Sequence, residues 1–306
     1  MAGPIQLFDR SLLDARRRRA LARPPADADF LLRSAVDDLL DRLSVVKRDF
    51  PLAVDLGTPL PALAERLSAL PQIGRIARID RLTETLAGQE AAIAADPELL
   101  PLRDASVDLV VSALAFQWLS DVPGALAQIH RALKPDGLMM VNLLGGETLH
   151  ELRQCLTTAE AELTGGASPR VAPFAELRDL GGLLQRTGFA LPVIDQDRLI
   201  VRYANAFELM RDLRAMGAAN ALVERSRRPA SRQLFLRTAS IYAERYSDPD
   251  GRIRATFDII SLSGWSPHES QQKPLKPGSA RTRLADALGV TEELAGDKAS
   301  HTKSEG

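Results

Sequence analysis

The chain has 306 residues, 45% of them hydrophobic, so it can bury a large core in one elaborated domain or in two small ones. Its 39 basic and 40 acidic residues almost cancel, leaving a net charge of -1 and no overall field that favours nucleic acid or an anionic membrane surface. No apolar run approaches the ~20 residues that span a bilayer, and the one cysteine, Cys155, cannot form an internal disulfide, so we expect a cytoplasmic protein without a transmembrane segment.

The first part of the chain, residues 1–48, has the apolar spacing of helices. Hydrophobic side chains recur at intervals of three and four residues and mark one buried face: Phe30, Leu31, Val36, Leu39, Leu40, Leu43 and Val46. The arginine run from Arg16 to Arg19 fits either a solvated helix face or a surface that binds an acidic partner. Asp9 and Asp14 interrupt this basic pattern, and transit peptides are poor in acids, so we interpret the region as mature sequence.

Residues 49–265 alternate between short apolar runs and helical patterns. The runs predicted as strands are Leu52 to Leu56, Arg75 to Ile79, Val107 to Leu114 and Leu138 to Leu144. The intervening helices are predicted at Pro61 to Leu70, Pro123 to Leu133 and Glu147 to Leu163. Such alternation is typical of an α/β fold, in which a doubly wound, mostly parallel sheet is covered by helices on both faces. In Lys134-Pro135-Asp136-Gly137 the proline ends a helix, and we expect Gly137 to accept a positive φ angle.

The last third of this domain contains two more strands with a helical insertion between them, at about 203–250. The elements predicted there are the strands Phe189 to Val201 and Thr256 to Ser263 and the helices Ala206 to Met216 and Arg228 to Tyr246. We expect the inserted helices to cover the carboxyl edge of the sheet. Residues 266–306 form a C-terminal extension, and its end is polar and without periodicity, so we expect that end to be disordered.

Acidic residues follow successive predicted strands, at the edge where parallel sheets bind ligands. Asp55 and Gly57 close the first strand, where glycine lets the backbone approach a ligand and the next helix offers free N–H groups. Asp80 closes the second strand, where an acidic residue would accept hydrogen bonds from ribose hydroxyls. Asp96 follows a short apolar run and could receive the amino group of an adenine.

The end of the next strand adds Ala113 and an aromatic pair, Phe116 and Trp118, which could wall a pocket. Aromatic side chains more often pack in a core, and each aspartate could instead cap the turn or helix that follows it. The order of the acids along successive strand ends favours a ligand site, because unrelated caps have no reason to fall in that order.

These features resemble the successive motifs of the class I S-adenosylmethionine-dependent methyltransferases, whose sheet is seven-stranded and Rossmann-like. The matching residues are Asp55-Leu56-Gly57, Asp80, Asp96, Val107 to Ser112 and Leu133 to Gly137. The chain also resembles, more narrowly, the methyltransferase-like assembly factors of respiratory complex I. That resemblance is carried by Phe8 to Leu13 with the arginine run, Gly145 to Arg153, Phe207 to Leu213 and Gly264 to Gln272. The malonyl-carrier-protein O-methyltransferases of biotin synthesis look like more distant relatives.

The resemblance implies that S-adenosylmethionine is the cofactor, held by Asp55, Gly57, Asp80, Asp96, Ala113 and Phe116. It also implies a methyltransferase-like or arginine hydroxylase-like enzyme that modifies a protein or carrier-bound substrate in the context of complex I assembly, with a complex I subunit as partner. The cofactor turn departs from the family pattern Asp-x-Gly-x-Gly-x-Gly, because Pro59 and Pro61 supply neither a positive φ nor an N–H donor. The alternative is a noncatalytic assembly factor that kept the fold but lost the cofactor.

The catalytic residues are unknown from the sequence, which shows no evident base. Candidates for substrate contacts are Gln117, Trp118, His150 and His268. A glutamine can orient a substrate but cannot accept a proton at neutral pH, and a lone histidine is more often structural than catalytic. The four histidines are scattered and the single cysteine offers no zinc spacing, so we expect no metal site.

Overall fold

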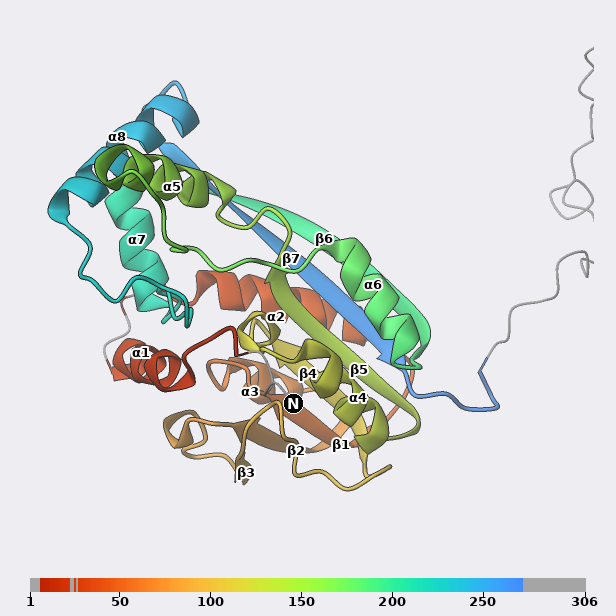
Figure 1. Cartoon of the computed structure of the whole chain (residues 1–306). Helices are drawn as coiled ribbons and strands as arrows, with labels where there is room; N and C mark the ends of the chain where they lie inside the picture. Colours follow the sequence, from red (N-terminus) through yellow and green to blue (C-terminus); the bar gives the residue numbers. More distant parts are fainter. Residues whose placement is uncertain (1–5, 23–24, 26, 272–306) are drawn as a thin grey trace, which may run out of the picture. The chain divides into compact units, whose positions relative to one another are not determined.

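A seven-stranded sheet forms the centre of the molecule, with the strand order β3-β2-β1-β4-β5-β7-β6 (Figure 1). The computed structural model describes residues 6–22, 25 and 27–271, and the end of the extension, expected to be disordered, lies outside these residues. The strands are β1 (Phe50–Leu56), β2 (Ile73–Asp80), β3 (Ala91–Ala94), β4 (Val107–Ala113), β5 (Leu133–Gly145), β6 (Ala190–Tyr203) and β7 (Ile253–Trp265). This confirms the predicted α/β class.

Five strands are parallel and the last hairpin reverses direction. Among β1 to β5, every neighbouring pair (β3 with β2, β2 with β1, β1 with β4, and β4 with β5) is parallel, whereas β7 pairs antiparallel with both β5 and β6. Parallel strands need crossover connections, which the intervening helices supply. The carboxyl ends of β1, β2, β3 and β4 therefore meet at one edge of the sheet.

Helices cover both faces, because side chains that alternate along each strand enter two separate cores. On β5, for example, Met140 packs in the core that contains α2 and α3, whereas Met139 and Val141 pack in the core that contains α4 and α6. The helices are α1 (Arg10–Ala22), α2 (Phe30–Ser44), α3 (Ala62–Leu67), α4 (Val122–Ala132), α5 (His150–Thr164), α6 (Leu177–Arg186), α7 (Ala206–Ala215) and α8 (Arg232–Tyr246). Strands buried on both faces are expected to be mostly apolar, as β5 is from Leu138 to Leu144, where Asn142 alone is polar.

The inserted helices lie where the sequence predicts them, beyond the carboxyl end of the sheet. Figure 1 shows α7 and α8 grouped there with α5, away from α4 and α6. The α8 helix begins at Arg232 and not at Arg228, because the Ser231 side chain accepts a hydrogen bond from the Leu234 N–H (3.1 Å) and caps it there. The α5 helix likewise begins at His150, later than the predicted Glu147. Within the described residues no helix is long and apolar enough to cross a membrane.

The segment Lys134 to Gly137, predicted as a turn, lies at the start of β5 and differs from its prediction in a second respect. The positive φ falls on Asp136 (φ 64°) and not on Gly137. Gly137 is required for a different reason: a Cβ atom there would lie 2.9 Å from the Lys134 carbonyl oxygen and 3.2 Å from that of Asp108. The close approach of the Lys134 and Asp108 carbonyl oxygens, rather than a left-handed conformation, explains the glycine.

We predict that Gly74→Ala destabilises the sheet between β1 and β2. A Cβ atom at Gly74 would lie 2.5 Å from the Pro51 carbonyl oxygen, and backbone cannot move aside as a side chain can. The free energy of unfolding should fall by about 1–3 kcal/mol in urea denaturation, as for other overpacked sites. Gly166→Ala is the matched control, since nothing lies within 4 Å of its added Cβ. Equal stabilities for the two variants would contradict the register of this strand pair.

Candidate functional site

The candidate site is a cleft at the carboxyl ends of β1, β2 and β4, which we call the strand-end cleft. Its floor is the turn after β1, where Gly57 has a φ of 71°. A Cβ atom at Gly57 would lie 3.2 Å from the Ala115 Cβ and 3.4 Å from the Pro97 Cγ. The glycine therefore lets the turn approach the segments that follow β3 and β4. This arrangement brings Asp55, Gly57, Asp80 and Asp96 to one edge of the sheet.

A buried ion pair holds the turn in place. Asp55 is 0% exposed and Arg78 is 1% exposed, with the Arg78 Nε atom 2.9 Å from Asp55 Oδ2. The other nitrogens of this guanidinium donate to backbone carbonyls, from Nη1 to Thr85 (2.6 Å) and from Nη2 to Thr58 (2.6 Å) and Leu60 (3.2 Å). Burial raises the pKa of Asp55 to about 6, although the charge of Arg78 opposes that rise. Asp55 thus acts here as the counter-ion of a residue that braces the turn.

The predicted ribose ligand, Asp80, is already engaged by the N-terminal helix. Arg17 of α1 donates two hydrogen bonds to its carboxylate, at 3.1 and 2.7 Å, and the Leu82 N–H donates a third at 2.9 Å. Asp80 is 1% exposed, so these partners shield its carboxylate from solvent. Bidentate pairing of this kind is among the stronger hydrogen-bonding arrangements in proteins.

The predicted adenine ligand, Asp96, is engaged in the same way. Arg81 donates to Asp96 at 2.9 Å, and Arg10 of α1 pairs with both Asp96 and Glu98. Arg81 also pairs with Asp14 of α1 at 2.9 Å. The space left between these side chains, Gly57 and Ala115 is only about 50 Å³. The strand-end cleft is therefore largely filled by arginine side chains.

Two more predicted cofactor contacts are structural in this conformation. The N–H of Ala113 donates to the Thr58 hydroxyl (3.1 Å), and Ala113 is fully buried. Phe116, in the short 3₁₀ turn η2 (Phe116–Trp118), is 1% exposed and packs in the apolar core beside α4. Of the two interpretations of Phe116, core and pocket wall, the structure places it in the core.

Gln117 and Trp118 line two adjoining cavities beside the strand-end cleft. The front chamber, of about 380 Å³, lies between α1, α2, the Pro59–Leu60 turn and the segment after α7. The rear chamber, of about 250 Å³, lies between α5, α7 and the segment 170–174. The Gln117 side chain donates to the Leu114 carbonyl (2.7 Å) and accepts from the Leu144 N–H (3.4 Å), which fixes it between the ends of β4 and β5.

The two candidate histidines lie outside these cavities. The His150 ring contacts Glu147 (Nδ1 to the carbonyl oxygen, 3.0 Å) and packs edge-on against Tyr246 at 6.1 Å between ring centroids. His268 follows Trp265, which pairs with Leu138 at the opposite edge of the sheet from the cleft. Neither histidine is brought near Asp80 or Asp96.

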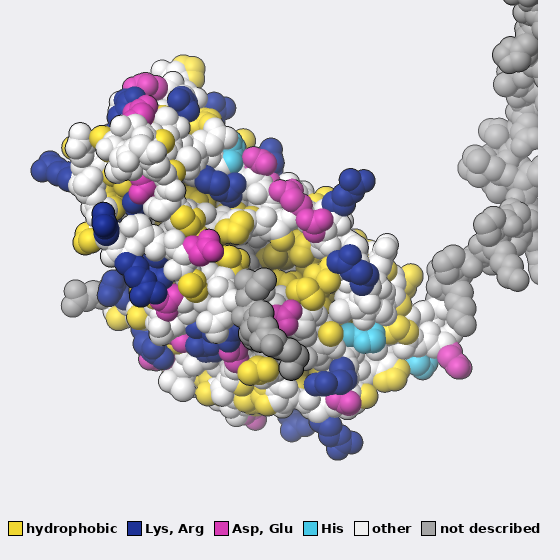
Figure 2. Space-filling model, in the orientation of Figure 1, with side chains coloured by type: hydrophobic (Ala, Val, Ile, Leu, Met, Phe, Trp, Pro, Cys, Tyr) yellow, Lys and Arg dark blue, Asp and Glu magenta, His cyan; other side chains and the backbone are white. Residues whose placement is uncertain are grey.

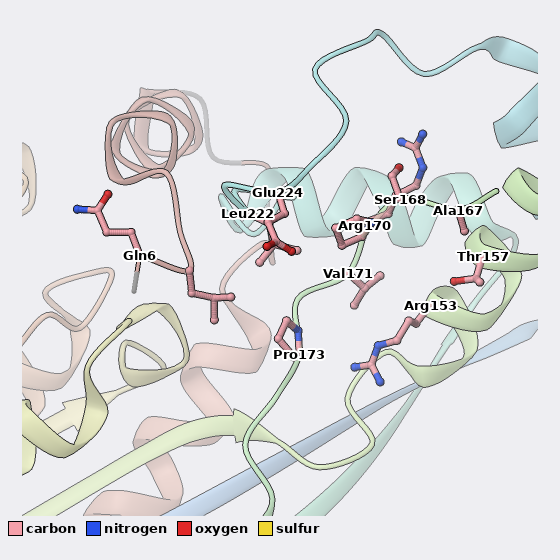
Figure 3. Close-up of a pocket in the computed structure, with 12 residues that line it drawn as sticks. Gln6, Arg153, Thr157, Ala167, Ser168, Arg170, Val171, Pro173, Leu222 and Glu224 are labelled. Atoms are coloured by element: carbon pink, nitrogen blue, oxygen red, sulfur yellow. The ribbon is translucent and has the colours of Figure 1, made fainter. Parts of the chain in front are cut away.

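A further cavity among the described residues, about 560 Å³ and larger than the cleft and either chamber, is an open groove beside α5 (Figure 3). Figure 3 shows Arg153 and Thr157 reaching toward it from α5, opposite Leu222 and Glu224. It shares Arg170 and Val171 with the rear chamber and has no residue in common with the strand-end cleft. Size alone would select this groove, but the strand topology places a ligand of a doubly wound sheet at the cleft.

No group of three or more His, Cys, Asp or Glu side chains in the described part of the chain could hold a metal ion. The single thiol, Cys155, is buried on α5, and burial raises its pKa to about 11. A protonated, buried thiol is a packing group and not a nucleophile.

The sheet order and the cleft define a class I S-adenosylmethionine-dependent methyltransferase domain, and the family model "Methyltransferase domain" matches residues 55–141. The chain is 40% identical over 292 residues to "Arginine-hydroxylase NDUFAF5, mitochondrial" of Danio rerio, covering 92% of this chain and 89% of the relative. It is 38% identical over 297 residues to the Homo sapiens protein of the same name, covering 95% and 85%. The chain belongs to the methyltransferase family that includes these NDUFAF5 proteins.

Two further comparisons widen the family and support the fold. The "Malonyl-[acyl-carrier protein] O-methyltransferase" of Methylovorus sp. (strain MP688) is 33% identical over 300 residues, covering 91% of this chain and 99% of the relative. The crystal structure of the YcgJ protein from Bacillus subtilis superposes with a TM-score of 0.52 at 15% identity, covering 76% of this chain and 99% of that one. The NDUFAF5 names refer to mitochondria, so the cytoplasmic location stays a prediction for this chain.

We predict that Arg78→Met strongly destabilises the protein. The substitution leaves the Asp55 carboxylate and the Thr58 carbonyl buried without their partner, which typically costs about 3–5 kcal/mol. Arg75→Met on the same strand is the control, because Arg75 is exposed and should change the free energy of unfolding by less than about 0.5 kcal/mol. Urea denaturation of both variants measures the difference in the free energy of unfolding. Similar values for the two variants would show that Arg78 does not stabilise the turn.

Proposed function

We propose that the chain binds S-adenosylmethionine in the strand-end cleft and modifies a protein or carrier-bound substrate, in the context of respiratory complex I assembly. One observation carries the proposal: Gly57 and Asp96 come from separate strand ends and line a single cleft at the ligand-binding edge of the sheet, and Asp80, at a third strand end, is bonded to Arg17 of the same cleft. Asp80 would hold the ribose hydroxyls and Asp96 the adenine amino group. The complex I context rests on the family resemblance.

The residues fit this cofactor only if α1 rearranges. Both acids have arginine partners from α1, and the cavity of about 50 Å³ is far smaller than the 300 Å³ or more of ordinary ligand pockets. The main apolar anchor of α1 is Leu13, its one buried residue, so the helix is held largely by its charged contacts. In this proposal the cofactor exchanges places with Arg10 and Arg17, and α1 acts as a movable cover.

The residues that line the two chambers restrict the kind of group that could accept a methyl group from the cofactor. When bound, the cofactor supplies a methyl group on a positively charged sulfur, and the acceptor must arrive with a free electron pair. Asp29 is the only carboxylate among the described lining residues of the two chambers, and it lies 3.5 Å from Arg33. With no base placed at Gln117 or Trp118, the acceptor is best an atom that is already deprotonated, such as a carboxylate oxygen. The malonyl-carrier-protein relatives act, by name, on a compound that offers one.

A noncatalytic assembly role is the second candidate, and one specific feature favours it. Pro59 and Pro61 remove two N–H donors from the cofactor turn, while Arg10 and Arg17 of α1 pair with the acids without any ligand. In that role the closed cleft would be the working state of the protein. The two candidates differ in whether the cleft can open to a ligand.

We predict micromolar binding of S-adenosylhomocysteine by calorimetric titration, and a loss of at least tenfold in Asp80→Asn. The neutral amide would keep the shape of the side chain but lose the charge that strengthens its hydrogen bonds to ribose hydroxyls. Asp179→Asn, at an exposed position on α6, should bind as the wild type does. Absence of heat at millimolar ligand, with the protein folded by circular dichroism, would favour the noncatalytic role.

We also predict that Arg17→Ala raises the affinity for S-adenosylhomocysteine about tenfold. Arg17 competes for the carboxylate of Asp80, and the lost bidentate pair corresponds to about 1.4 kcal/mol of that competition. Arg19→Ala is the control, because Arg19 is exposed on the same helix. A lower affinity in Arg17→Ala would show instead that Arg17 holds the ligand, and α1 would not be a competing cover.

A further inference from the structure

The open groove beside α5, which we call the outer groove, lies between two pieces of irregular backbone. One piece is a short antiparallel ladder, in which the Asp9 N–H donates to the Ala221 carbonyl (2.8 Å) and the Val223 N–H to the Leu7 carbonyl (3.0 Å). The other piece is the segment 167–173, which follows α5 and is neither helix nor strand. Figure 2 shows hydrophobic side chains beside charged ones of both signs on the face between α5 and α1. An occupant of this face would therefore meet apolar surface and charges together.

Arg153 reaches the outer groove from α5, is half-buried and has no counter-ion among the described residues. Its two hydrogen bonds are long, both 3.4 Å from Nη2, and they end on the carbonyls of Thr148 and Ala172. The Nε atom is enclosed and has no described partner. The other arginine of the groove, Arg170, is instead fully engaged with Glu160, through Nε (3.0 Å) and Nη2 (2.6 Å). Because a charge taken out of water needs an opposite charge nearby, an anion in the groove would stabilise Arg153.

The opposite side of the outer groove carries a negative charge. Glu224 is the only carboxylate among its described lining residues, and it is exposed and forms no ion pair with a described residue. Figure 3 shows Glu224 and Arg153 on opposite sides of the groove. An ion pair at an exposed carboxylate contributes little, whereas a charge-assisted hydrogen bond to a half-buried guanidinium contributes more. An acidic group of the occupant would therefore decide the affinity, and a basic group the direction in which the occupant lies.

The size and lining of the outer groove favour a chain molecule over a free anion. Its volume of about 560 Å³ is that of sites that hold whole organic ligands, so a single small anion on Arg153 would leave most of it empty. Side chains of Leu7, Val171 and Leu222 supply apolar surface between the charges. The Val171 N–H donates to no described group, so it is available to a backbone carbonyl of an extended peptide, as the N–H groups of a sheet edge are.

We propose that the outer groove binds an extended segment of a partner protein, with an aspartate or glutamate of that segment on Arg153, an apolar side chain against Val171 and Leu222, and a lysine or arginine toward Glu224. The inference goes beyond the function proposed above, because it assigns a docking surface that has no lining residue in common with the strand-end cleft. It holds equally for an enzyme and for a noncatalytic assembly factor, since neither role decides what the groove binds.

The test begins with a selection of random peptides displayed on phage, carried out in parallel on the full wild-type chain and on its Arg153→Met variant. We expect the peptides that are enriched on the wild type alone to share an acidic residue beside an apolar one. The most enriched of these, the parent peptide, is then titrated calorimetrically. Replacing its acidic residue by the corresponding amide should weaken binding about tenfold, because a charge-assisted hydrogen bond to Arg153 is lost.

A double-mutant cycle locates the acidic residue of the peptide. The parent peptide should bind Arg153→Met about tenfold more weakly than it binds the wild type, and on this variant the amide replacement should have no further effect. Arg178→Met, at an exposed position of α6, is the matched control and should bind the parent peptide normally. Circular dichroism shows whether each variant folds. If Arg153→Met does not fold, Thr157→Trp takes its place in the selection and the titrations, because an indole at this exposed lining position would obstruct the groove.

Four results would overturn the proposal. The first is a selection in which no peptide is enriched on the wild type over the variant, and the second is equal binding of the parent peptide and its amide version. The third is inorganic phosphate that binds as tightly as the parent peptide, which would make the groove a small-anion site. The fourth is a dimer of the chain that the parent peptide dissociates in analytical ultracentrifugation, because a second copy would then be the occupant. No cofactor enters these measurements, so their outcome is independent of the titration with S-adenosylhomocysteine.

Discussion

The buried pair of Asp55 and Arg78 is the interaction on which the arrangement of the cleft depends. Both side chains are shielded from water, so neither can lose the other without exposing a charge to an apolar interior. Through its remaining nitrogens Arg78 fixes the carbonyls of Thr58 and Leu60, which set the course of the chain between β1 and α3. The side chain of Arg78 thus fixes the conformation of the proline-bearing turn. In a glycine-rich turn the conformation would instead depend on the φ and ψ angles that glycine can adopt.

A second layer of charge covers this turn from the solvent side. The near-neutral composition of the chain hides a strong local pattern, in which arginines of α1 face acids at the ends of β2 and β3. These acids bind the arginines of the protein itself, and under the proposed function the same acids would bind the cofactor. An enzyme built this way would exchange one set of charge-assisted hydrogen bonds for another when it is loaded, which keeps the net free energy of the exchange small.

The sequence predicts the fold well because the fold depends on local and periodic signals. Alternating apolar runs and helical patterns located the sheet, and the residues at the strand ends converged as parallel topology requires. The ion-pair partners of the charged residues could not be predicted from the sequence. Arg17 and Asp80 are 63 residues apart and Arg10 and Asp96 are 86 apart, and no spacing rule connects them. Arg78 offered one signal, an arginine directly between the apolar Ala77 and Ile79, yet its carbonyl partners depend on tertiary structure.

The dependence of α1 on ion pairs has a consequence for how the protein responds to its medium. The outermost pair, Arg18 with Glu84, is about half exposed, whereas Arg17 with Asp80 is nearly enclosed, so added salt should weaken them in that order. A rise in ionic strength would then weaken the exposed ion pairs of α1 first and the enclosed ones later, before it affects the apolar core. A ligand that must displace α1 would meet a different barrier in dilute buffer than in the crowded, salty interior of a cell, and an affinity measured in one does not transfer to the other.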